Sequence, residues 1–482
     1  MQKTERKFKP EDLPTKADMI EWYNKVLELA EIVDKRYPVK GTFVWMPYGL
    51  RIMKALVREW DRLFQNSQIE EVYFPLFVPI EYARKNREWF DGFKDNLYYV
   101  SSLKEKEQFV LRSTGEPAMY PIFELWIKQG KLPIKVYQTV SSFRYEGRTT
   151  HSLIRDREIT YWYEIHTVHR TEEECEKEVE KHVRMHDYLW REVLCIPPIE
   201  ARRPPYDVFP GAEYSIENFT ILPDGRLLEN GSVNNLGQAY ARRFNLGYID
   251  EKGNKNYCWQ VCTGNGGRYV VAALLLHGDE RGLVLPPRIA PVQISIVPIF
   301  KKSNKNEIIA EAKKVSLFLS KHGMRCFIDE REEITVGEKF YLWEIKGAPI
   351  RMELGKKELA SKMLTIFRRD AKTKTPVENK DILPFVTSLL DKEIPETLSQ
   401  KVGKFYDSKV RRFDKVESAL EWIKDDGVAK INWCEEKACY DSLASLEQGI
   451  ESTGTLEDES SPGHCLICGK KTQKLTLLGR GY

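Results

Sequence analysis

The chain lacks a hydrophobic segment long enough to cross a membrane. No apolar run in its 482 residues approaches the ~18 residues that a membrane helix needs. The N-terminal stretch from Met1 to Arg6 is polar and lacks the apolar core of a signal peptide. We therefore expect a cytoplasmic protein with no membrane partner.

The chain also has little net charge. Its 75 basic and 72 acidic residues leave a net charge of +3, so the composition does not indicate a nucleic-acid partner. Any RNA-binding surface must therefore be a local basic patch. Internal repeats are absent, and so are the glycine motifs of the dinucleotide-binding and Walker types, which argues against those two kinds of nucleotide site.

Cysteine is sparse, and its odd count argues against a secreted disulfide framework. Four of the nine cysteines come late in the chain as two pairs, Cys434 with Cys439 and Cys465 with Cys468. Tetrahedral zinc needs short-spaced pairs of this kind on two turns. We therefore predict a structural Zn²⁺ site in a reducing compartment, with His464 as a possible substitute for one thiol.

The length and the residue patterns together predict three domains. A chain of 482 residues is too long for one hydrophobic core. The proline-rich segment 286–291 is typical of a stiff linker, and the alternation of strands and helices over 292–368 predicts a small α/β domain. A long helical region, 382–423, connects to the paired cysteines. The predicted domains are 1–287, 288–395 and 396–482.

A charged hairpin is the most informative stretch of the sequence. Residues 135–140 and 153–159 have the pattern of two strands, with a loop over 147–151. Residues two apart in a strand share a face, which predicts two pairs: Arg144 with Glu146, and Arg155 with Arg157. A nucleoside triphosphate would offer partners that make burial of these charges less costly. A cross-strand ladder of salt bridges on a solvated face is the alternative.

Two polar residues precede a helix predicted over 118–129. The carboxylate of Glu116, two residues after Thr114, could hold the ammonium group of a ligand. In the alternative interpretation, Thr114 caps the helix and Glu116 lies near its positive end.

A later polar segment and a glycine cluster could also contribute to a site. Glu229, Ser232 and Asn234 could line a cavity or satisfy the edge of a sheet. The glycines before Arg268 allow close approach of the backbone to a ligand. Because Arg268 begins the next predicted helix, it could meet phosphate there.

Basic residues gather around the later strands of the predicted α/β domain. They are Arg351, Lys356, Lys357, Arg368, Arg369, Lys372 and Lys374. Such a cluster could follow an RNA backbone. Because acidic residues interleave with it, a solvated face is the alternative.

Three motifs in this order resemble those of class II aminoacyl-tRNA synthetases. They are 40–47 with 73–75, then 143–146 with 155–158, and last Arg268 with His277-Gly278-Asp279. Among these enzymes, the prolyl-tRNA synthetases of the archaeal and eukaryotic type are the most similar. The features that indicate this group are the segment 282–287, the four late cysteines and the final Tyr482. This resemblance covers nearly the whole chain.

The resemblance implies an α/β multidomain fold with an antiparallel β-sheet catalytic domain flanked by helices. An α/β anticodon-binding domain and a small zinc-binding α/β domain would follow. The implied protein is a homodimer that uses ATP with Mg²⁺ to attach L-proline to tRNA(Pro) through prolyl-adenylate.

The resemblance also implies roles for individual residues. Arg144 would bridge the amino acid carboxylate and the α-phosphate, and Glu146 would accept a hydrogen bond from the adenine amino group. The implied amino acid contacts are Thr114, Glu116, Arg144 and Asn234. The implied ATP contacts are Arg144, Glu146, Arg155, Glu229, Ser232 and Arg268. The implied anticodon contacts, to guanines, are Glu344, Arg351 and Lys357, and an arginine can bind a guanine edge through two hydrogen bonds.

Some positions depart from the pattern of the family. Glu229, Ser232 and Asn234 stand where the family has glutamine, threonine and histidine, and Gly115 and glycines 266–267 stand where it has hydroxyl residues. Glu229 adds negative charge near the triphosphate, which weakens ATP binding unless Mg²⁺ or Arg268 compensates. Two alternatives follow: a paralogue that activates another small amino acid or a proline analogue, and a synthetase-like RNA-binding regulatory protein without activation chemistry.

Overall fold

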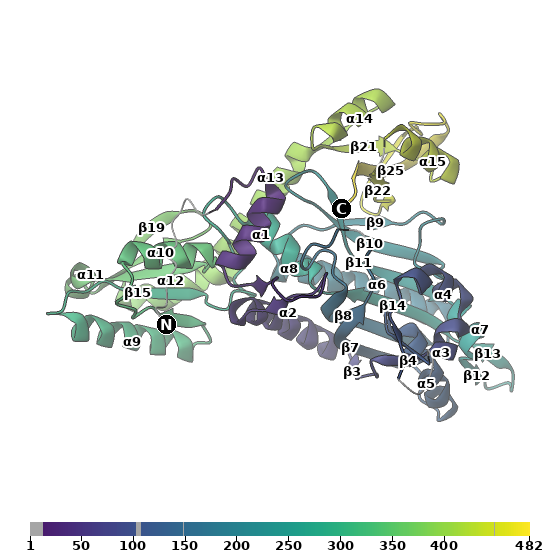
Figure 1. Ribbon diagram of the computed structural model, residues 1–482, viewed down its shortest axis with the longest axis horizontal. Coiled ribbons are helices and arrows are strands. Elements are labelled where there is room, and N and C mark those ends of the chain that lie inside the picture. Colours follow the sequence, from purple (N-terminus) through teal and green to yellow (C-terminus); the bar gives the residue numbers. More distant parts are fainter. Residues whose placement is uncertain (1–12, 103–107, 148, 448) are drawn as a thin grey trace.

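An eight-stranded sheet forms the centre of the computed structural model, which describes residues 13–102, 108–147, 149–447 and 449–482 (Figure 1). Its neighbours pair antiparallel, except that β3 runs parallel to β7. In spatial order the strands are β23 (Thr455–Leu456), β9 (Ile199–Arg202), β10 (Tyr214–Ile221), β11 (Leu227–Gly237), β14 (Trp259–Asn265), β8 (Glu158–His169), β7 (Ile134–Phe143) and β3 (Glu70–Glu71). The predicted antiparallel sheet is confirmed. The stretch from Met1 to Arg6, and Arg148 of the predicted loop, lie outside the described residues.

Helices cover both faces of this sheet. They are α1 (Met19–Leu29), α2 (Pro47–Asn66), α5 (Glu116–Lys128), α6 (Glu172–Tyr188), which continues into a π-helical turn (Leu189–Val193), α7 (Ala239–Phe244) and α8 (Arg268–His277). Capping explains where α6 begins, because the Thr171 hydroxyl accepts a hydrogen bond from the Glu174 amide at 3.2 Å. Every residue of α8 after Arg268 is buried, so this helix forms the middle of the core.

The two faces of the sheet carry different side chains. On β8, Tyr163 and Ile165 pack into an apolar core with α1, α2 and α8. Trp162, Glu164 and His166 point to the opposite face, because successive strand residues alternate. A second apolar core, which includes residues of α5 and α7, lies on that opposite face. The polar residues of β8 therefore lie beside this second core.

The charged hairpin differs from its prediction. The first strand ends at Phe143 and the second begins at Glu158, so Arg144, Glu146, Arg155 and Arg157 are not in strands. Arg155 closes a tight turn through a bridge with His151, and Leu153 has a positive φ of 70°. Arg157 stacks on the Tyr145 ring at 4.3 Å, whereas Arg155 faces the cavity. The predicted pairing of Arg155 and Arg157 on one strand face is therefore wrong.

An α/β unit follows the proline-rich segment, as predicted. Its sheet has the order β16-β15-β17-β18-β19, with β15 parallel to β16 and β17. The elements are β15 (Ile294–Pro298), α9 (Lys305–Lys321), β16 (Cys326–Ile328), α10 (Val336–Ile345), β17 (Ile350–Leu354), α11 (Lys356–Ser361), β18 (Met363–Arg368), β19 (Thr373–Glu378) and α12 (Ile382–Ser388). Neither α11 nor β19 was expected from the sequence.

The predicted long helix over 382–423 is interrupted. After α12 come a π-helical turn (Leu389–Glu393) and α13 (Ile394–Lys409); the chain then forms β20 (Val410–Arg412) before α14 (Val416–Lys424). The interruption follows from pairing with a later strand, since β20 runs parallel to β21. The rest of this part consists of β21 (Val428–Asn432), α15 (Lys437–Leu446), β22 (Ile450–Ser452), β24 (Ser460–His464) and β25 (Lys471–Arg480).

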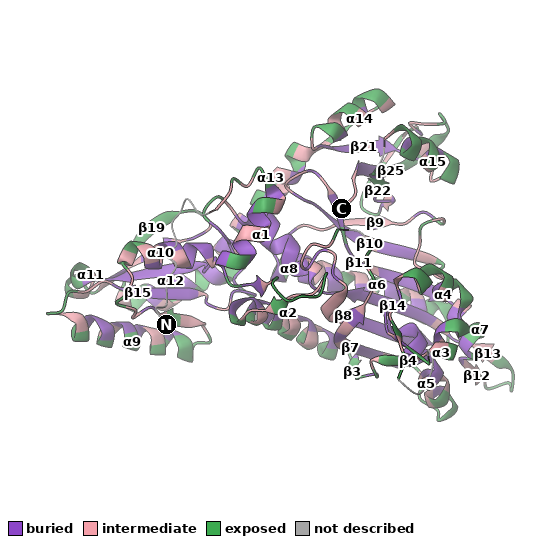
Figure 2. Ribbon diagram, viewed as in Figure 1, coloured by how far each residue is buried: buried purple, intermediate pink, exposed green. Residues whose placement is uncertain are grey.

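Short elements complete the part of the chain that precedes the α/β unit. They are β1 (Val33–Asp34), β2 (Val44–Trp45), β4 (Phe77–Pro79), α3 (Ile80–Lys85), α4 (Arg87–Phe93), β5 (Tyr99–Val100), β6 (Phe109–Leu111), β12 (Gly247–Ile249) and β13 (Lys255–Tyr257), with 3-10 turns at Lys94–Asn96 and, in the α/β unit, Asn379–Asp381. Figure 2 shows the central strands and α8 largely buried and the outer sides of α9 and α14 exposed. Among the described residues, no helix has the length and apolar character needed to cross a membrane.

Candidate active site

One cavity brings together every residue for which an amino acid or ATP contact was expected. It has a volume of about 280 Å³ and lies against β8, β11 and β14. The segment after β7 and the first residue of α8 also line it. The expected residues that line this cavity are Thr114, Glu116, Arg144, Glu146, Arg155, Glu229, Ser232, Asn234 and Arg268.

Arg144 presents a cation to this cavity. Its guanidinium lies between the rings of Phe93 and Trp162, at 5.6 and 5.8 Å from their centroids. Its Nε has no hydrogen-bond partner among the described residues. Burial lowers the pKa of Arg144, and the positive charge of Arg268 lowers it further. Two cations in one partly closed cavity favour an anionic ligand.

Glu116 presents the opposite charge. It is the first residue of α5, it is 2% exposed, and its Oε2 has no hydrogen-bond partner among the described residues. The alternative in which Thr114 caps this helix is wrong, because the Thr114 hydroxyl instead accepts a hydrogen bond from Trp89 Nε1 at 2.7 Å. A buried carboxylate with an open oxygen suits a ligand ammonium group.

The sequence analysis missed a buried network beneath Glu116. Glu164 accepts hydrogen bonds from the Gly115 amide and from Gln138 Nε2, both at 2.7 Å, and lies 3.3 Å from His166 Nε2. Burial alone would lower the pKa of His166, but Glu164 and the charge of Glu116 raise it above its usual value. The two neighbouring carboxylates therefore favour the protonated form of His166. The alternation of polar residues along β8 was the signal that could have revealed both residues.

Asn234 is held in a polar network at the cavity wall. Its Oδ1 accepts a hydrogen bond from the Ser215 hydroxyl at 2.6 Å. Its Nδ2 donates to the Ser232 hydroxyl at 3.0 Å and to the Cys262 sulfur at 3.5 Å. Cys262, another lining residue that the sequence analysis missed, is a buried thiol whose pKa burial raises well above its usual value. This wall is therefore polar and uncharged.

The arginines at the other end of the cavity are fixed by main-chain oxygens. Arg268 Nη1 donates to the Glu229 carbonyl at 2.6 Å, and Arg155 Nη2 donates to the main-chain oxygen of Tyr482 at 2.5 Å. Burial, followed by the charge of Glu229, raises the pKa of Glu217 well above its usual value. Glu217 and Glu229 thus lie close enough to repel each other, and Arg203 and Arg268 are the cations that oppose this effect on Glu217.

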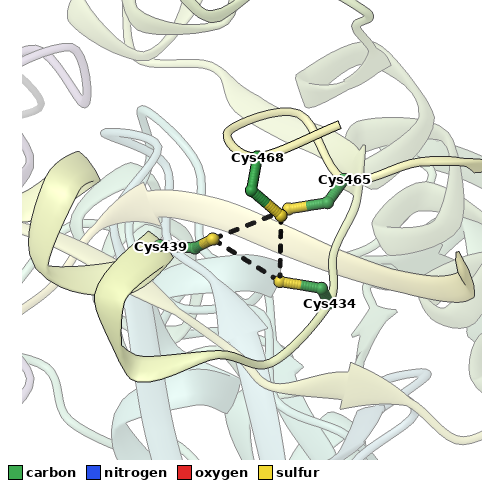
Figure 3. A group of neighbouring side chains, drawn as sticks. All are labelled: Cys434, Cys439, Cys465 and Cys468. Atoms are coloured by element: carbon green, nitrogen blue, oxygen red, sulfur yellow. Dashed lines mark hydrogen bonds between the residues drawn. The ribbon is translucent and has the colours of Figure 1, made fainter. Parts of the chain in front are cut away.

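Four thiols meet in the C-terminal part. Figure 3 shows the sulfurs of Cys434, Cys439, Cys465 and Cys468 turned toward one another. The sulfur of Cys434 lies 3.5 Å from that of Cys439 and 3.7 Å from that of Cys468. Zinc–sulfur bonds of ~2.3 Å in a tetrahedron place the sulfurs ~3.8 Å apart, so the four thiols fit one zinc ion. His464 is not part of this group.

Two of the expected anticodon contacts are paired and buried. Arg351 Nη1 donates to Glu344 Oε1 at 2.9 Å, and the Arg351 guanidinium lies between the rings of Phe340 and Phe367. Lys357 is exposed on α11.

Carboxylates neutralise most of the basic cluster around these residues. The members in ion pairs are Arg351, Arg368, Arg369, Lys372 and Lys374. Within the described ranges, only Lys356 and Lys357 of this cluster form no ion pair. The ion pairs show that acidic residues interleave with this cluster in space as they do in the sequence, and RNA binding by the cluster stays a prediction.

Comparison with known families agrees with this geometry. Residues 98–277 match the class II tRNA synthetase core domain of the G, H, P, S and T type, and residues 293–389 match an anticodon-binding domain. The fold and the site thus define a class II aminoacyl-tRNA synthetase.

Individual relatives show which family within this class the chain resembles. The chain is 39% identical to the proline–tRNA ligase of Methanopyrus kandleri, with 96% of each chain covered. It is 38% identical to that of Thermococcus kodakarensis, with 96% of this chain and 97% of the relative covered. A Giardia lamblia prolyl-tRNA synthetase in complex with prolyl-adenylate has a TM-score of 0.93 and 29% identity, with 98% of this chain and 100% of that chain covered. The chain belongs to the prolyl-tRNA synthetases of the archaeal and eukaryotic type.

Tight packing behind the cavity gives a test of its geometry. A Cβ added at Gly264 would lie 2.6 Å from Trp162 Cζ2, so Gly264→Ala must displace this ring, which Arg144 contacts. We expect a loss of ~1–3 kcal/mol in the free energy of unfolding, measured by urea titration, because overpacking forces such shifts.

Gly147→Ala is the matched control, since no atom lies within 4 Å of its added Cβ. It should change the free energy of unfolding by less than ~0.5 kcal/mol. Equal stability of Gly264→Ala and the unsubstituted protein would contradict the described packing of Trp162.

Proposed function

We propose that this chain attaches proline to tRNA(Pro) in an ATP-dependent reaction that passes through prolyl-adenylate. One observation carries this proposal: a single cavity holds an open carboxylate oxygen on Glu116 and an open guanidinium nitrogen on Arg144. An imino acid presents the complementary charges. Its ammonium group pairs with Glu116, and its carboxylate pairs with Arg144.

The chemistry needs no side-chain nucleophile. A carboxylate oxygen of proline attacks the α-phosphorus of ATP, the bond to the bridging oxygen of pyrophosphate breaks, and pyrophosphate leaves with both electrons of that bond. A terminal ribose hydroxyl of tRNA then attacks the carbonyl carbon, and AMP leaves. The chain accelerates both steps by aligning the reactants and by stabilising negative charge at phosphorus. In this scheme Arg144 bridges the proline carboxylate and the α-phosphate.

The remaining contacts complete the ATP site. Glu146 accepts from the adenine amino group, and Arg155 and Arg268 bind the triphosphate. Because both arginines already donate to main-chain oxygens, they are oriented before ATP arrives. The carboxylates of Glu217 and Glu229 would hold the Mg²⁺ that accompanies ATP, since a divalent cation offsets the repulsion from Glu229 that adds to burial in raising the pKa of Glu217.

The first test measures amino acid-dependent exchange between ATP and pyrophosphate across a panel of small amino acids, followed by charging of tRNA. We expect proline to be the preferred substrate. Arg144→Ala should lower the proline-dependent exchange rate by ~100-fold to 1,000-fold, because it removes one charged donor from the reacting centre. Binding of tRNA should stay measurable.

Arg191→Ala is the control, since its exposed ion pair with Asp187 is remote from the lining residues. A strong preference for another amino acid would replace the proposal with a paralogue whose pocket, with Asn234 and Cys262, has a different substrate. Binding of RNA without exchange for any amino acid would favour a regulatory protein. Normal exchange in Arg144→Ala would refute the role given to Arg144.

Recognition of tRNA belongs to a second domain in this proposal. We assign 1–287 to catalysis, 288–395 to anticodon binding and 396–482 to the C-terminal domain, with Glu344, Arg351 and Lys357 contacting anticodon guanines. Arg351 engages three of its five N–H groups with described carboxylates. Two N–H groups of Arg351 remain, and the edge of a guanine accepts two hydrogen bonds from an arginine.

A structural Zn²⁺ in the four-thiol site is the next part of the proposal. Four thiolates leave no open position for catalysis, and the metal would contribute on the order of 10 kcal/mol to the folding of this domain. Free thiols at all nine cysteines also support a reducing, cytoplasmic location.

Metal analysis tests the four-thiol site. We expect about one zinc ion per purified chain, and Cys465→Ser should lose it because three thiols hold the ion more weakly. Cys326→Ser, which changes a free cysteine of the α/β unit, is the control and should keep the metal. Retention of zinc by Cys465→Ser, or its absence from the unsubstituted protein, would contradict the assignment.

Exposed aromatic side chains near the three-stranded sheet β4-β6-β5 support a homodimer. Tyr73 is 77% exposed and Phe77 is 52% exposed. Phe109 lies beside Phe77, with ring centroids 6.2 Å apart. Aromatic clusters of this kind favour burial against another protein surface. A second copy of the chain is the partner that the family resemblance implies.

Sedimentation velocity measures this association. We expect a mass of about twice 56.3 kDa for the unsubstituted chain and a monomer for Phe77→Asp, because a charge at a buried interface loses its water without gaining a partner. Leu317→Asp on α9, at a residue that is 58% exposed, is the control and should stay dimeric. A dimer of unchanged stability in Phe77→Asp would rule out this surface.

A further inference from the structure

A chain of ion pairs joins the end of α8 to the expected anticodon contacts. Asp279, two residues after α8, accepts two hydrogen bonds from Arg369 of the α/β unit, at 2.6 and 2.8 Å. Arg369 is 1% exposed, and its Nε also donates to the Glu344 carbonyl at 3.2 Å. Burial alone would raise the pKa of Asp279, but Arg369 holds it well below its usual value. This pair is therefore ionised at neutral pH.

Arg281 extends the same chain of contacts to Glu344. The Arg281 Nε donates to Glu344 Oε2 at 2.5 Å, while Glu344 Oε1 accepts from Arg351 at 2.9 Å. The carboxylate thus has one arginine on each oxygen. The side chain of Glu344 is 7% exposed, whereas that of Arg281 is 50% exposed. Glu344 is fixed inside the α/β unit by a residue from the segment that leaves the catalytic core.

The backbone around Arg281 fixes this geometry. The amides of Leu283 and Leu285 donate to the carbonyls of Ile345 and Gly347, at 3.0 and 3.1 Å. Gly282 has a φ of 123°, and an added Cβ would lie 2.5 Å from the Ile345 Cα. The segment that carries Arg281 therefore packs tightly against the C-terminal end of α10. This packing fixes the direction from which the Arg281 side chain approaches Glu344.

We propose that Arg281 is a positioning residue for anticodon recognition, through Glu344 and Arg351. This inference rests on the proposed function, because it takes Arg351 as a contact to an anticodon guanine. With Arg281 in place, each oxygen of Glu344 has its own donor. Without Arg281, Glu344 Oε2 turns to Arg351 and occupies an N–H group that the guanine edge needs.

The position of Arg281 makes this effect separable from folding and from catalysis. Half of its side chain faces solvent, so its loss leaves no large cavity. It is not among the residues that line the active-site cavity, and Glu344 keeps Arg351 as a partner. The stability of the catalytic core and the activation of proline should therefore be insensitive to the substitution.

The experiment measures proline-dependent exchange and the charging of two tRNA(Pro) transcripts, one native and one with an anticodon guanine replaced by adenine. We expect Arg281→Ala to raise the KM for the native transcript about tenfold, the size of a lost guanine contact. Its kcat and its exchange rate should stay unchanged. Discrimination between the two transcripts should fall toward that of Arg351→Ala, and the double variant should add nothing further.

Two further variants separate positioning from a general loss of domain contact. Arg281→Lys keeps the charge, offers a single donor group and should rescue part of the KM. Glu31→Gln removes a different ion pair at the end of α10, the one between Glu31 and Lys346, and leaves Arg281 and Glu344 in contact. We expect it to charge both transcripts as the unsubstituted protein does.

The outcomes distinguish this inference from the proposed function. Absence of proline-dependent exchange in the unsubstituted protein overturns the proposed function and this inference with it. Normal exchange with full discrimination in Arg281→Ala overturns only the inference. Equal losses in Glu31→Gln and Arg281→Ala also overturn it, because they indicate a general loosening of the domain contact. Additive effects of Arg281→Ala and Arg351→Ala on the discrimination between the two transcripts would also overturn the inference.

Discussion

Two opposite charges share one cavity, and each has a side-chain atom without a hydrogen-bond partner among the described residues; this is the constraint around which the site is built. The open atoms are Glu116 Oε2 and Arg144 Nε. A buried polar group without its hydrogen bond costs ~1–3 kcal/mol, and a charged one costs more. The surrounding structure offsets this cost with an apolar core on each face of the sheet. It also holds Glu116 firmly, because Glu164 binds the Gly115 amide directly before it. The stored cost is relieved when a ligand with complementary charges enters.

The residues that line this cavity were predictable where they lie in local motifs. Thr114, Glu116, Arg144 and Arg268 each stand at the start of a helix or the end of a strand, and such positions can be read from the sequence. Glu164 and His166 were missed because their roles depend on which face of β8 they occupy. The predicted strand covered 153–159 and ended before both residues, whereas β8 runs from Glu158 to His169.

At the level of the fold, local periodicity was enough for the α/β unit apart from α11 and β19, and it was not enough for the C-terminal part. The strands and helices between Ile294 and Arg368 alternate in a pattern that each segment shows by itself. By contrast, β20 exists because Val410 pairs with Val428, which lies beyond an intervening helix. The same limit applies to β23, whose Leu456 joins the central sheet beside Ala201. Pairing between distant segments overrides a local preference for helix.

Helix α8 connects the cavity with the α/β unit. Its first residue, Arg268, faces the cavity, and the turn after its last residue carries Asp279, which binds the α/β unit. Ten residues of helix span ~15 Å, and every residue after Arg268 is buried. Because a close-packed core transmits displacement instead of absorbing it, the two ends of α8 cannot move independently. Any shift of the Asp279 and Arg369 pair therefore changes the orientation of a helix whose other end binds the triphosphate in the proposed reaction. The ion pairs around Asp279 thus anchor the C-terminal end of this helix to the α/β unit.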